Sequence, residues 1–276
     1  MTHEFRAACI QMRSGVDIER NMSEASRLIL EAKALGADFV ATPEMTTLFE
    51  GEGEALLAKA QTEAADICVP RFRALAEELG IWLLVGSMPI KVSDTQCANR
   101  SYLIGPDGRV AATYDKIHMF DVQVGDGQTY RESSRFRPGT RAVVTETSWG
   151  PVGLSICYDV RFAYLYRTLA HAGAKLLTVP AAFTRVTGEA HWHVLLRARA
   201  IETGSFVVAP AQCGRHENGR ETFGHSLIID PWGRILAEGG TEPGIFMATI
   251  DFKASDEARA KIPALKHDCD FAGPAA

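Results

Sequence analysis

Apolar residues recur along the chain with two different spacings, and these spacings predict strands and helices in regular succession. Short apolar runs predict buried strands at 7–11, 38–42, 82–85, 100–104, 109–113, 142–147, 152–156, 176–179, 206–209, 226–229, 234–237 and 245–250. Apolar residues three or four positions apart predict amphipathic helices at 17–35, at 52–79 with an interruption at Pro70, at 161–172 and at 189–202. This order of elements is typical of an α/β protein.

Two predicted hairpins mark corresponding places in the two halves of the chain. Gly105-Pro106-Asp107-Gly108 and Asp230-Pro231-Trp232-Gly233 both carry turn-forming residues, and each hairpin follows two β-α units. A four-layer α-β-β-α sandwich, with two sheets face to face and helices outside, would bury both halves. Because no linker or shift in composition divides the chain, we expect a single domain over 1–276, with its core at about 4–252 and a C-terminal tail at 253–276.

Composition and charge exclude several classes of protein. A hydrophobic content of 46% and a charged content of 23% are those of a globular protein. The net charge of -5 offers no basic patch for nucleic acid. We see no signal leader, and no apolar run approaches the roughly 20 residues of a membrane-spanning helix. We therefore expect a cytoplasmic protein that binds neither nucleic acid nor membrane.

One of the six cysteines stands in a position that suits catalysis. The cysteines form no C-x-x-C pair, so they indicate neither a disulfide framework nor a zinc knuckle. Cys157 follows the predicted strand 152–156 and precedes a predicted helix, which would present its thiol at the end of the strand. Backbone N–H groups of the next turn could face an oxyanion, and a helix N-terminus favours thiolate. A buried structural cysteine is the alternative.

Three charged residues are further candidates. Glu44 ends a predicted buried strand, where a carboxylate is costly unless it is paired or functional. Lys116 and Glu132 lie in 114–139, which reads as a long loop, and loops of that length are usually functional. The alternatives are a salt-bridged carboxylate and ordinary surface charges. His191 and His193 are two positions apart on a predicted helix and so do not share a face, which argues against a metal pair.

Taken together, these positions resemble a known signature. Pro43-Glu44, 114–118 and Cys157-Tyr158-Asp159-Val160-Arg161 resemble, in order and spacing, the Glu–Lys–Cys motifs of the nitrilase-like carbon–nitrogen hydrolases. The resemblance extends from Ala7 to about Ile250. It implies the α-β-β-α fold, a homodimer, no cofactor or metal, and hydrolysis of non-peptide C–N bonds, and it places the family's second glutamate at Glu132.

The resemblance assigns each residue a role in amide hydrolysis through a thioester. Glu44 would take the proton of the Cys157 thiol and pass it to the leaving nitrogen. Lys116 would stay charged and, with the backbone N–H of Tyr158, would bind the oxyanion. Glu132 would orient Lys116. Water activated through Glu44 would then release the acyl group.

The second half of the chain resembles one branch of the family. Residues 188–202 and 211–216 are similar to the deaminated-glutathione amidases, which implies cleavage of deaminated glutathione into α-ketoglutarate and cysteinylglycine. We expect the polar segment 212–220 to bind the leaving dipeptide. Replacing Arg215 or Arg220 by alanine should then impair cleavage of deaminated glutathione selectively. The alternative is that this segment is an ordinary surface hairpin. The expected substrate-binding residues are Tyr158, Arg161, Phe183, Arg185 and Arg215.

Other functions stay open at this point. An omega-amidase acting on α-ketoglutaramate, or another small-molecule amidase, would use the same catalytic residues. An acyltransferase or an inactive ligand-binding homologue would belong to a different class. For the dimer, we expect an interface on the helix after Cys157, where Phe162, Leu165, Tyr166 and Leu169 form an apolar stripe too wide for one helix to bury alone.

Overall fold

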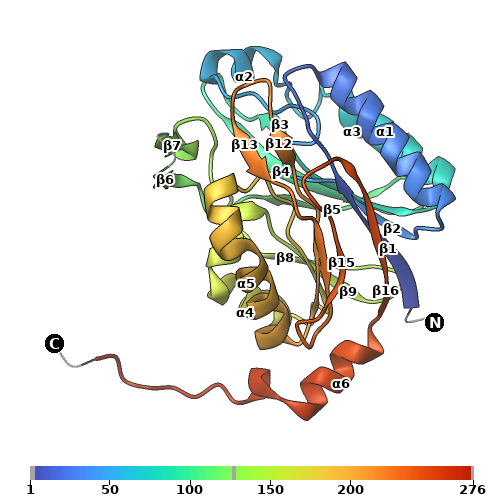
Figure 1. Ribbon diagram of the computed structural model, residues 1–276, viewed down its shortest axis with the longest axis vertical. Coiled ribbons are helices and arrows are strands. Elements are labelled where there is room, and N and C mark those ends of the chain that lie inside the picture. Colours follow the sequence, from blue (N-terminus) through green and yellow to red (C-terminus); the bar gives the residue numbers. More distant parts are fainter. Residues whose placement is uncertain (1–3, 126–128, 275–276) are drawn as a thin grey trace.

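The predicted four-layer sandwich is confirmed. The computed structural model describes residues 4–125 and 129–274, and in it two six-stranded sheets pack face to face with helices on both outer faces (Figure 1). Among these residues no helix is long and apolar enough to cross a lipid bilayer.

The first sheet combines strands from the N-terminal half with the last strand of the chain. Its order is β16 (Gly244–Asp251), β1 (Glu4–Gln11), β2 (Phe39–Ala41), β3 (Trp82–Lys91), β4 (Cys97–Ile104) and β5 (Val110–Asp115). The three central strands β1, β2 and β3 are parallel, and the remaining neighbours are antiparallel.

The second sheet repeats this arrangement. Its order is β8 (Val143–Glu146), β9 (Pro151–Leu154), β10 (Leu176–Thr178), β11 (Phe206–Ala209), β14 (Leu227–Ile229) and β15 (Ile235–Glu238). Again one antiparallel edge strand is followed by three parallel strands and an antiparallel hairpin. The two sheets therefore share one arrangement of parallel and antiparallel strands, and each ends in one of the predicted hairpins.

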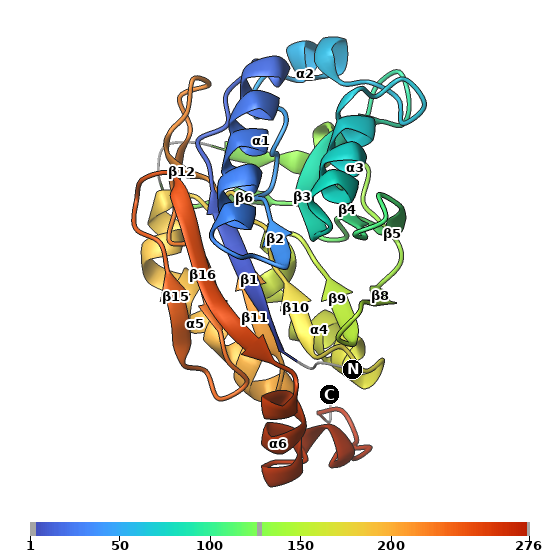
Figure 2. The same cartoon turned by 90° about the vertical axis from the view of Figure 1, so that its right-hand side faces the viewer.

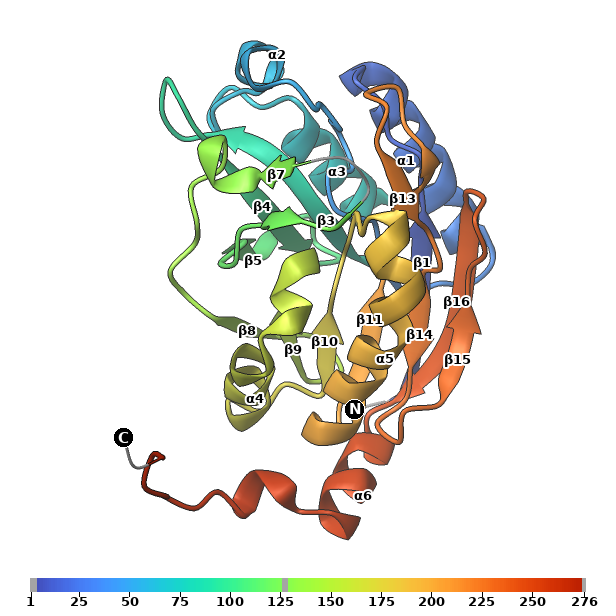
Figure 3. The same cartoon turned by 60° about the vertical axis from the view of Figure 1, so that its left-hand side comes forward.

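Helices cover the outer faces because alternate strand residues point to opposite sides of a sheet. Ala8 and Ile10 pack under α1 (Ile18–Ala34) and α3 (Cys68–Leu79), while Ala7 and Cys9 face the second sheet. Figure 2 shows α1 and α3 side by side. Figure 3 shows α4 (Ala163–His171) and α5 (Arg185–Thr203) over the second sheet. The interface between the two sheets is apolar throughout its centre.

Two predicted helix boundaries differ from the structure. The helical region 52–79 breaks at 60–67, between α2 (Gly53–Lys59) and α3, and not at Pro70. Pro70 lies in the first turn of α3, where a missing N–H costs nothing because it has no acceptor within the helix. Helix α5 begins before Glu189, since the hydroxyl of Thr184 caps its first turn.

The predicted loop 114–139 contains short elements. The hairpin of β6 (Asp121–Gln123) and β7 (Thr129–Arg131) leads into the 3₁₀ turn η1 (Glu132–Ser134). A second small hairpin, β12 (Cys213–Arg215) and β13 (Glu221–Phe223), lies in the polar segment 212–220 and just beyond it. These strands are short and largely polar, so they carry no apolar period for the sequence analysis to detect.

The C-terminal segment is partly helical. It forms α6 (Lys253–Lys261) and the 3₁₀ turn η3 (Ala264–Lys266) at one end of the sandwich (Figure 1). Ser255 donates a hydrogen bond to the carbonyl oxygen of Gly204, and Arg167 forms an ion pair with Asp268. The segment therefore packs against the ends of α4 and α5.

Candidate active site

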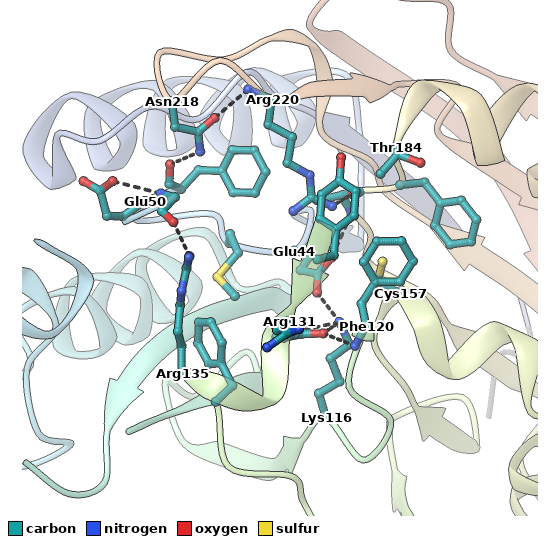
Figure 4. A pocket seen from close by; sticks show the side chains of 18 of the residues that line it. Glu44, Glu50, Lys116, Phe120, Arg131, Arg135, Cys157, Thr184, Asn218 and Arg220 are labelled. Carbon is teal, nitrogen blue, oxygen red and sulfur yellow. Dashed lines mark hydrogen bonds and ion pairs between the residues drawn. The ribbon is translucent and has the colours of Figure 1, made fainter. Parts of the chain in front are cut away.

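The four charged or nucleophilic groups singled out from the sequence meet in one cavity. Glu44 follows β2, Lys116 follows β5, Glu132 begins η1, and Cys157 begins the 3₁₀ turn η2 (Cys157–Arg161) after β9. All four line a cavity of about 520 Å³. Figure 4 shows Lys116 pointing toward Glu44, with Cys157 beside them.

A close approach of two strands fixes the position of Glu44. A side chain at Gly86 of β3 would place its Cβ only 1.9 Å from the carbonyl oxygen of Thr42, so only glycine fits there. The backbone N–H of Gly86 donates to the hydroxyl of Thr42 at 3.0 Å. This contact holds the turn that carries Glu44 against β3.

Lys116 lies between two carboxylates. Its Nζ is 2.9 Å from Oε1 of Glu44 and 2.8 Å from Oε2 of Glu132, and its side chain is only 2% exposed. Burial alone would lower the pKa of Lys116, but the two carboxylates outweigh it and raise the pKa well above its ordinary value. Lys116 is therefore an ammonium ion at neutral pH.

Glu44 is buried and ionised. Burial opposes its charge, but the ammonium group of Lys116 more than offsets this, so the pKa of Glu44 is below its ordinary value. The amide of Asn99 donates to Oε1 at 2.9 Å, and the backbone N–H of Ala182 donates to Oε2 at 2.8 Å. Both carboxylate oxygens are thus fixed, and the group can accept a proton in a defined direction.

Cys157 is held in a conformation that non-glycine residues rarely adopt. Its φ is 50°, and its backbone N–H donates to the carbonyl oxygen of Pro180 at 2.9 Å. Burial and then the negative charge of Glu44 raise the pKa of its thiol well above the ordinary value. The expectation that the following turn favours a thiolate is therefore wrong for the resting site. The group rests as a thiol beside an ionised carboxylate.

Asp159 holds the cysteine turn to the segment that carries Lys116, and the sequence analysis missed it. Its Oδ2 accepts hydrogen bonds from the backbone N–H of Ile156 at 2.9 Å and from the hydroxyl of Tyr114 at 2.7 Å. Its Oδ1 accepts from the backbone N–H of His118 at 3.1 Å. The side chain is fully buried, so one carboxylate ties together the two strand ends on which the site is built.

Only some of the expected substrate-binding residues lie at the cavity. Phe183 lines the cavity, and Tyr158 directly follows Cys157. The guanidinium of Arg161 lies over the rings of Tyr158 and Phe183, 5.7 and 5.6 Å from their centroids, and is not part of the cavity lining. Arg185 and Arg215 also lie outside the lining.

Arg185 and Arg215 are both exposed, for physical reasons that the sequence does not show. Arg185 forms ion pairs with Glu189 and Glu221 on the outer face of the molecule. Arg215 is exposed at the end of β12, where it pairs with Glu221 of β13 in the backbone register. Neither residue belongs to the lining of the cavity.

A different set of arginines lines the cavity. They are Arg131, Arg135 and Arg220. Nη2 of Arg220 donates to the carbonyl oxygen of Ala182 at 2.7 Å, and its guanidinium lies 5.3 Å from the ring centroids of both Phe49 and Tyr130. Its positive charge also helps to lower the pKa of Glu44. The only signal in the sequence was the position of Arg220 within the polar segment 212–220.

His216 ties this segment to the N-terminal half. Its Nδ1 lies 2.8 Å from the carbonyl oxygen of Ser14, and its Nε2 lies 2.7 Å from the hydroxyl of Thr222. A neutral imidazole satisfies both contacts by donating from Nδ1 and accepting at Nε2. Burial lowers the pKa of His216 from 6.5 to about 4.

His216 is therefore expected to make the fold sensitive to acid. Below pH 6.5 the unfolded chain binds a proton at His216 that the folded chain does not, so stability falls as the pH drops toward 4. Between pH 7 and pH 5 this should lower the free energy of unfolding by about 2 kcal/mol. Urea unfolding at both pH values should show this loss in the wild type and a smaller one in His216→Gln. An equal loss in the two proteins would contradict the assignment.

Comparison with known proteins agrees with this geometry. The family model described as carbon-nitrogen hydrolase matches residues 6–260. A deaminated glutathione amidase of Synechocystis sp. is 42% identical over 268 residues, which are 95% of this chain and 97% of the relative. The deaminated glutathione amidase of Homo sapiens is 37% identical over 265 residues, 94% of this chain and 81% of the relative.

Solved structures give the same answer. The NitFhit protein of C. elegans has a TM-score of 0.90 and is 35% identical to this chain. The match covers 97% of this chain and 65% of the longer NitFhit chain. An amidase from Nesterenkonia sp. has a TM-score of 0.80 at 28% identity and covers 95% of both chains. With its fold, its buried Glu–Lys pair and its full-length relatives, this chain belongs to the carbon-nitrogen hydrolase family of the nitrilase superfamily.

Proposed function

We propose that this enzyme hydrolyses deaminated glutathione through a thioester on Cys157. The observation that carries the proposal is the enclosed cluster in which Lys116 lies between Glu44 and Glu132 in the cavity that Cys157 also lines. The substrate is supported by relatives of 37–42% identity that are named deaminated glutathione amidases.

The first half of the reaction uses the resting protonation states. As the sulfur of Cys157 bonds to the amide carbon, the thiol proton passes to the carboxylate of Glu44, and the carbonyl electrons move to oxygen. The ammonium of Lys116 and the backbone N–H of Tyr158 stabilise that oxyanion. When the intermediate collapses, the C–N bond breaks and Glu44 returns the proton to the leaving nitrogen.

The second half releases the acid. Glu44, ionised again, takes a proton from water as the water oxygen attacks the thioester carbon. When the C–S bond breaks, Glu44 returns this proton to the sulfur, which restores the thiol and the ionised carboxylate. Glu132 keeps Lys116 in place, with its own Oε2 held by the backbone N–H of Phe120 at 2.7 Å. A covalent adduct at the active-site cysteine is described for a variant of the Nesterenkonia amidase with fluoroacetamide, and that chain has a TM-score of 0.80 and 27% identity to this one.

Arg220 is our candidate for binding the leaving dipeptide. Glu44 has to protonate the leaving nitrogen, so the leaving group lies on the Glu44 side of the cavity, where the charge of Arg220 acts. A guanidinium binds a carboxylate through two parallel hydrogen bonds. We propose that Arg220 binds the glycyl carboxylate of the departing cysteinylglycine.

Substrate preference tests the proposed function. We expect a higher kcat/KM for deaminated glutathione than for α-ketoglutaramate, because only the former offers a carboxylate on its leaving group. An equal or reversed preference would favour the activity of the omega-amidase of Mus musculus, a relative 35% identical over 95% of this chain. In that case the same catalytic residues would still act.

Replacement of Arg220 should separate the two substrates. Arg220→Gln should lower kcat/KM for deaminated glutathione by about 10- to 100-fold, the worth of a hydrogen bond to a charged group, with a much smaller loss for α-ketoglutaramate. Arg215→Gln is the matched control, since Arg215 lies outside the cavity on the same hairpin. Equal losses for both substrates in Arg220→Gln would rule out a leaving-group role.

We also propose a homodimer, but with a different surface from the one the sequence predicts. The expected stripe on α4 is mostly buried within the chain, since Leu165, Tyr166 and Leu169 pack into the core. The most exposed apolar side chains on these two helices are Tyr164 on α4 and Val194 on α5, 64% and 68% exposed. Light scattering should give twice the chain mass of 30.1 kDa for the wild type, and less for Val194→Asp. A monomeric wild type at working concentration would contradict the proposal.

A further inference from the structure

Outside the catalytic cavity, two histidines and a glutamate from separate elements meet at one point. His193 lies on α5, His225 precedes β14, and Glu238 ends β15. Nε2 of His193 lies 2.9 Å from Oε1 of Glu238, and Nδ1 of His225 lies 3.0 Å from the same oxygen. The three ligand atoms all lie within 4.8 Å of one another. None of the three residues lines the catalytic cavity.

The position of His225 is imposed by the backbone. Its φ of 52° lies in the left-handed region, which is unfavourable for a residue other than glycine. Its N–H donates to the carbonyl oxygen of Gly240 at 2.9 Å, and its carbonyl accepts from Nε1 of Trp192 at 2.8 Å. Its ring stacks on Phe223, with centroids 4.3 Å apart. The imidazole is therefore held in place from the backbone and from one ring face.

His193 is separate from its neighbour His191 on the same helix. Nδ1 of His191 lies 3.3 Å from Nη2 of Arg161, whereas His193 points toward His225 and Glu238. The spacing argument against a pair of His191 and His193 therefore agrees with the structure. The partner of His193 comes from a distant part of the chain, which no local motif reveals.

We propose that His193, His225 and Glu238 bind a divalent transition-metal ion of the Zn²⁺ type. Two imidazoles and one carboxylate are a donor set that zinc prefers, and a water molecule can complete the tetrahedron. The side chains of His193, His225 and Glu238 are 31%, 25% and 38% exposed, so ion and water can reach the site. Both ring nitrogens already face the same carboxylate oxygen, so a cation placed between the three groups would replace two hydrogen bonds with three ligand bonds.

The ion would connect elements that are distant in the sequence. It would join the middle of α5 to the β14–β15 hairpin. One of its ligands, His225, also accepts a hydrogen bond from the indole of Trp192 at its backbone carbonyl. The ring of Trp192 is 4.8 Å from that of Phe183, which lines the catalytic cavity. We therefore expect metal binding to stabilise the fold first, because a ligand that binds only the folded state shifts the unfolding equilibrium.

Calorimetric titration with ZnCl₂, after removal of metal by a chelator, tests the site. We expect one zinc ion per chain, and a melting temperature higher by roughly 5 °C when zinc is about 100 times its dissociation constant. His193→Gln and Glu238→Gln should each weaken binding by more than about 100-fold, since even residues behind the ligands cost about 10- to 100-fold. Both side chains are partly exposed, so these variants should fold.

Two matched controls separate this site from other places where zinc can bind. His191→Gln, two residues from His193 on the same helix, should bind zinc as the wild type does. Cys157→Ala should also bind zinc, because the catalytic thiol is not a ligand of this site. The proposal is overturned if His193→Gln keeps the wild-type affinity, if Cys157→Ala loses binding, or if the wild type binds zinc no more tightly than about 100 µM.

Discussion

Replacement of Cys157 by alanine is expected to lower kcat by about 10⁴-fold or more, because the nucleophile acts as part of a unit that fails when one member is removed. The thiol proton, the carboxylate of Glu44 and the ammonium of Lys116 take part in the same bond-forming step. Without the sulfur no thioester can form, and the remaining charges can only polarise the amide. The fold should persist, because alanine is smaller than cysteine and fits into the same space.

Steady-state rates with deaminated glutathione, on protein whose purity is verified by mass, measure this effect. Cys269→Ala is the control, since Cys269 is exposed and distant from the cavity, and it should keep the wild-type rate. The buried Cys213 gives a second control, in which the site chemistry should also be unchanged. A sizeable residual rate in Cys157→Ala would show that another group is the nucleophile.

Replacement of Lys116 by methionine is expected to lower kcat by about 10³-fold, with a much smaller change in KM. Loss of one oxyanion donor alone costs about 10²- to 10³-fold. Lys116 also neutralises part of the negative charge of the buried Glu44 and of the partly buried Glu132. Without the ammonium, burial should raise the pKa of Glu44, so part of the enzyme would lose its base.

The pH dependence separates these two effects. In the wild type the lowered pKa of Glu44 keeps the base ionised until the pH falls below the ordinary glutamate value. In Lys116→Met the acid limb of kcat/KM should move to higher pH. Loss of the cation beside a buried carboxylate can cost about 3–5 kcal/mol of stability, so the melting temperature is measured first. Lys116→Arg serves as the charged control. An unchanged kcat in a folded Lys116→Met enzyme would refute the role.

The fold could be predicted from the sequence because its layers impose regular periods. Strands buried on both faces appear as continuous apolar runs, and outer helices show one apolar side. The hairpins at 105–108 and 230–233 revealed that the two halves match. The small hairpins were missed because β6, β7, β12 and β13 are short and mostly polar, and the break before α3 was misplaced because proline is tolerated in the first turn of a helix.

The site was predictable only in part, for a related reason. Glu44, Lys116 and Cys157 each follow the C-terminal end of a strand, and these strand ends lie at the same edge of the sandwich. Most other residues that line the cavity come from loops, whose side chains show no periodic pattern in the sequence. Arg220 enters the cavity while Arg215, five residues earlier on the same hairpin, points to solvent. Asp159 was missed because its partners Tyr114 and His118 are distant in the sequence.

The central claim is that an acyl group passes through the sulfur of Cys157. Turnover mixtures quenched in acid within milliseconds, digested and analysed by mass spectrometry test it most directly. Deaminated glutathione and α-ketoglutaramate should give the same adduct, a 4-carboxy-4-oxobutanoyl group on the peptide that contains Cys157, because they share that acyl group and differ only in what leaves. The adduct should be absent from Cys157→Ala. Rapid turnover with an unmodified Cys157 at every quench time, or an adduct on another residue, would contradict the account.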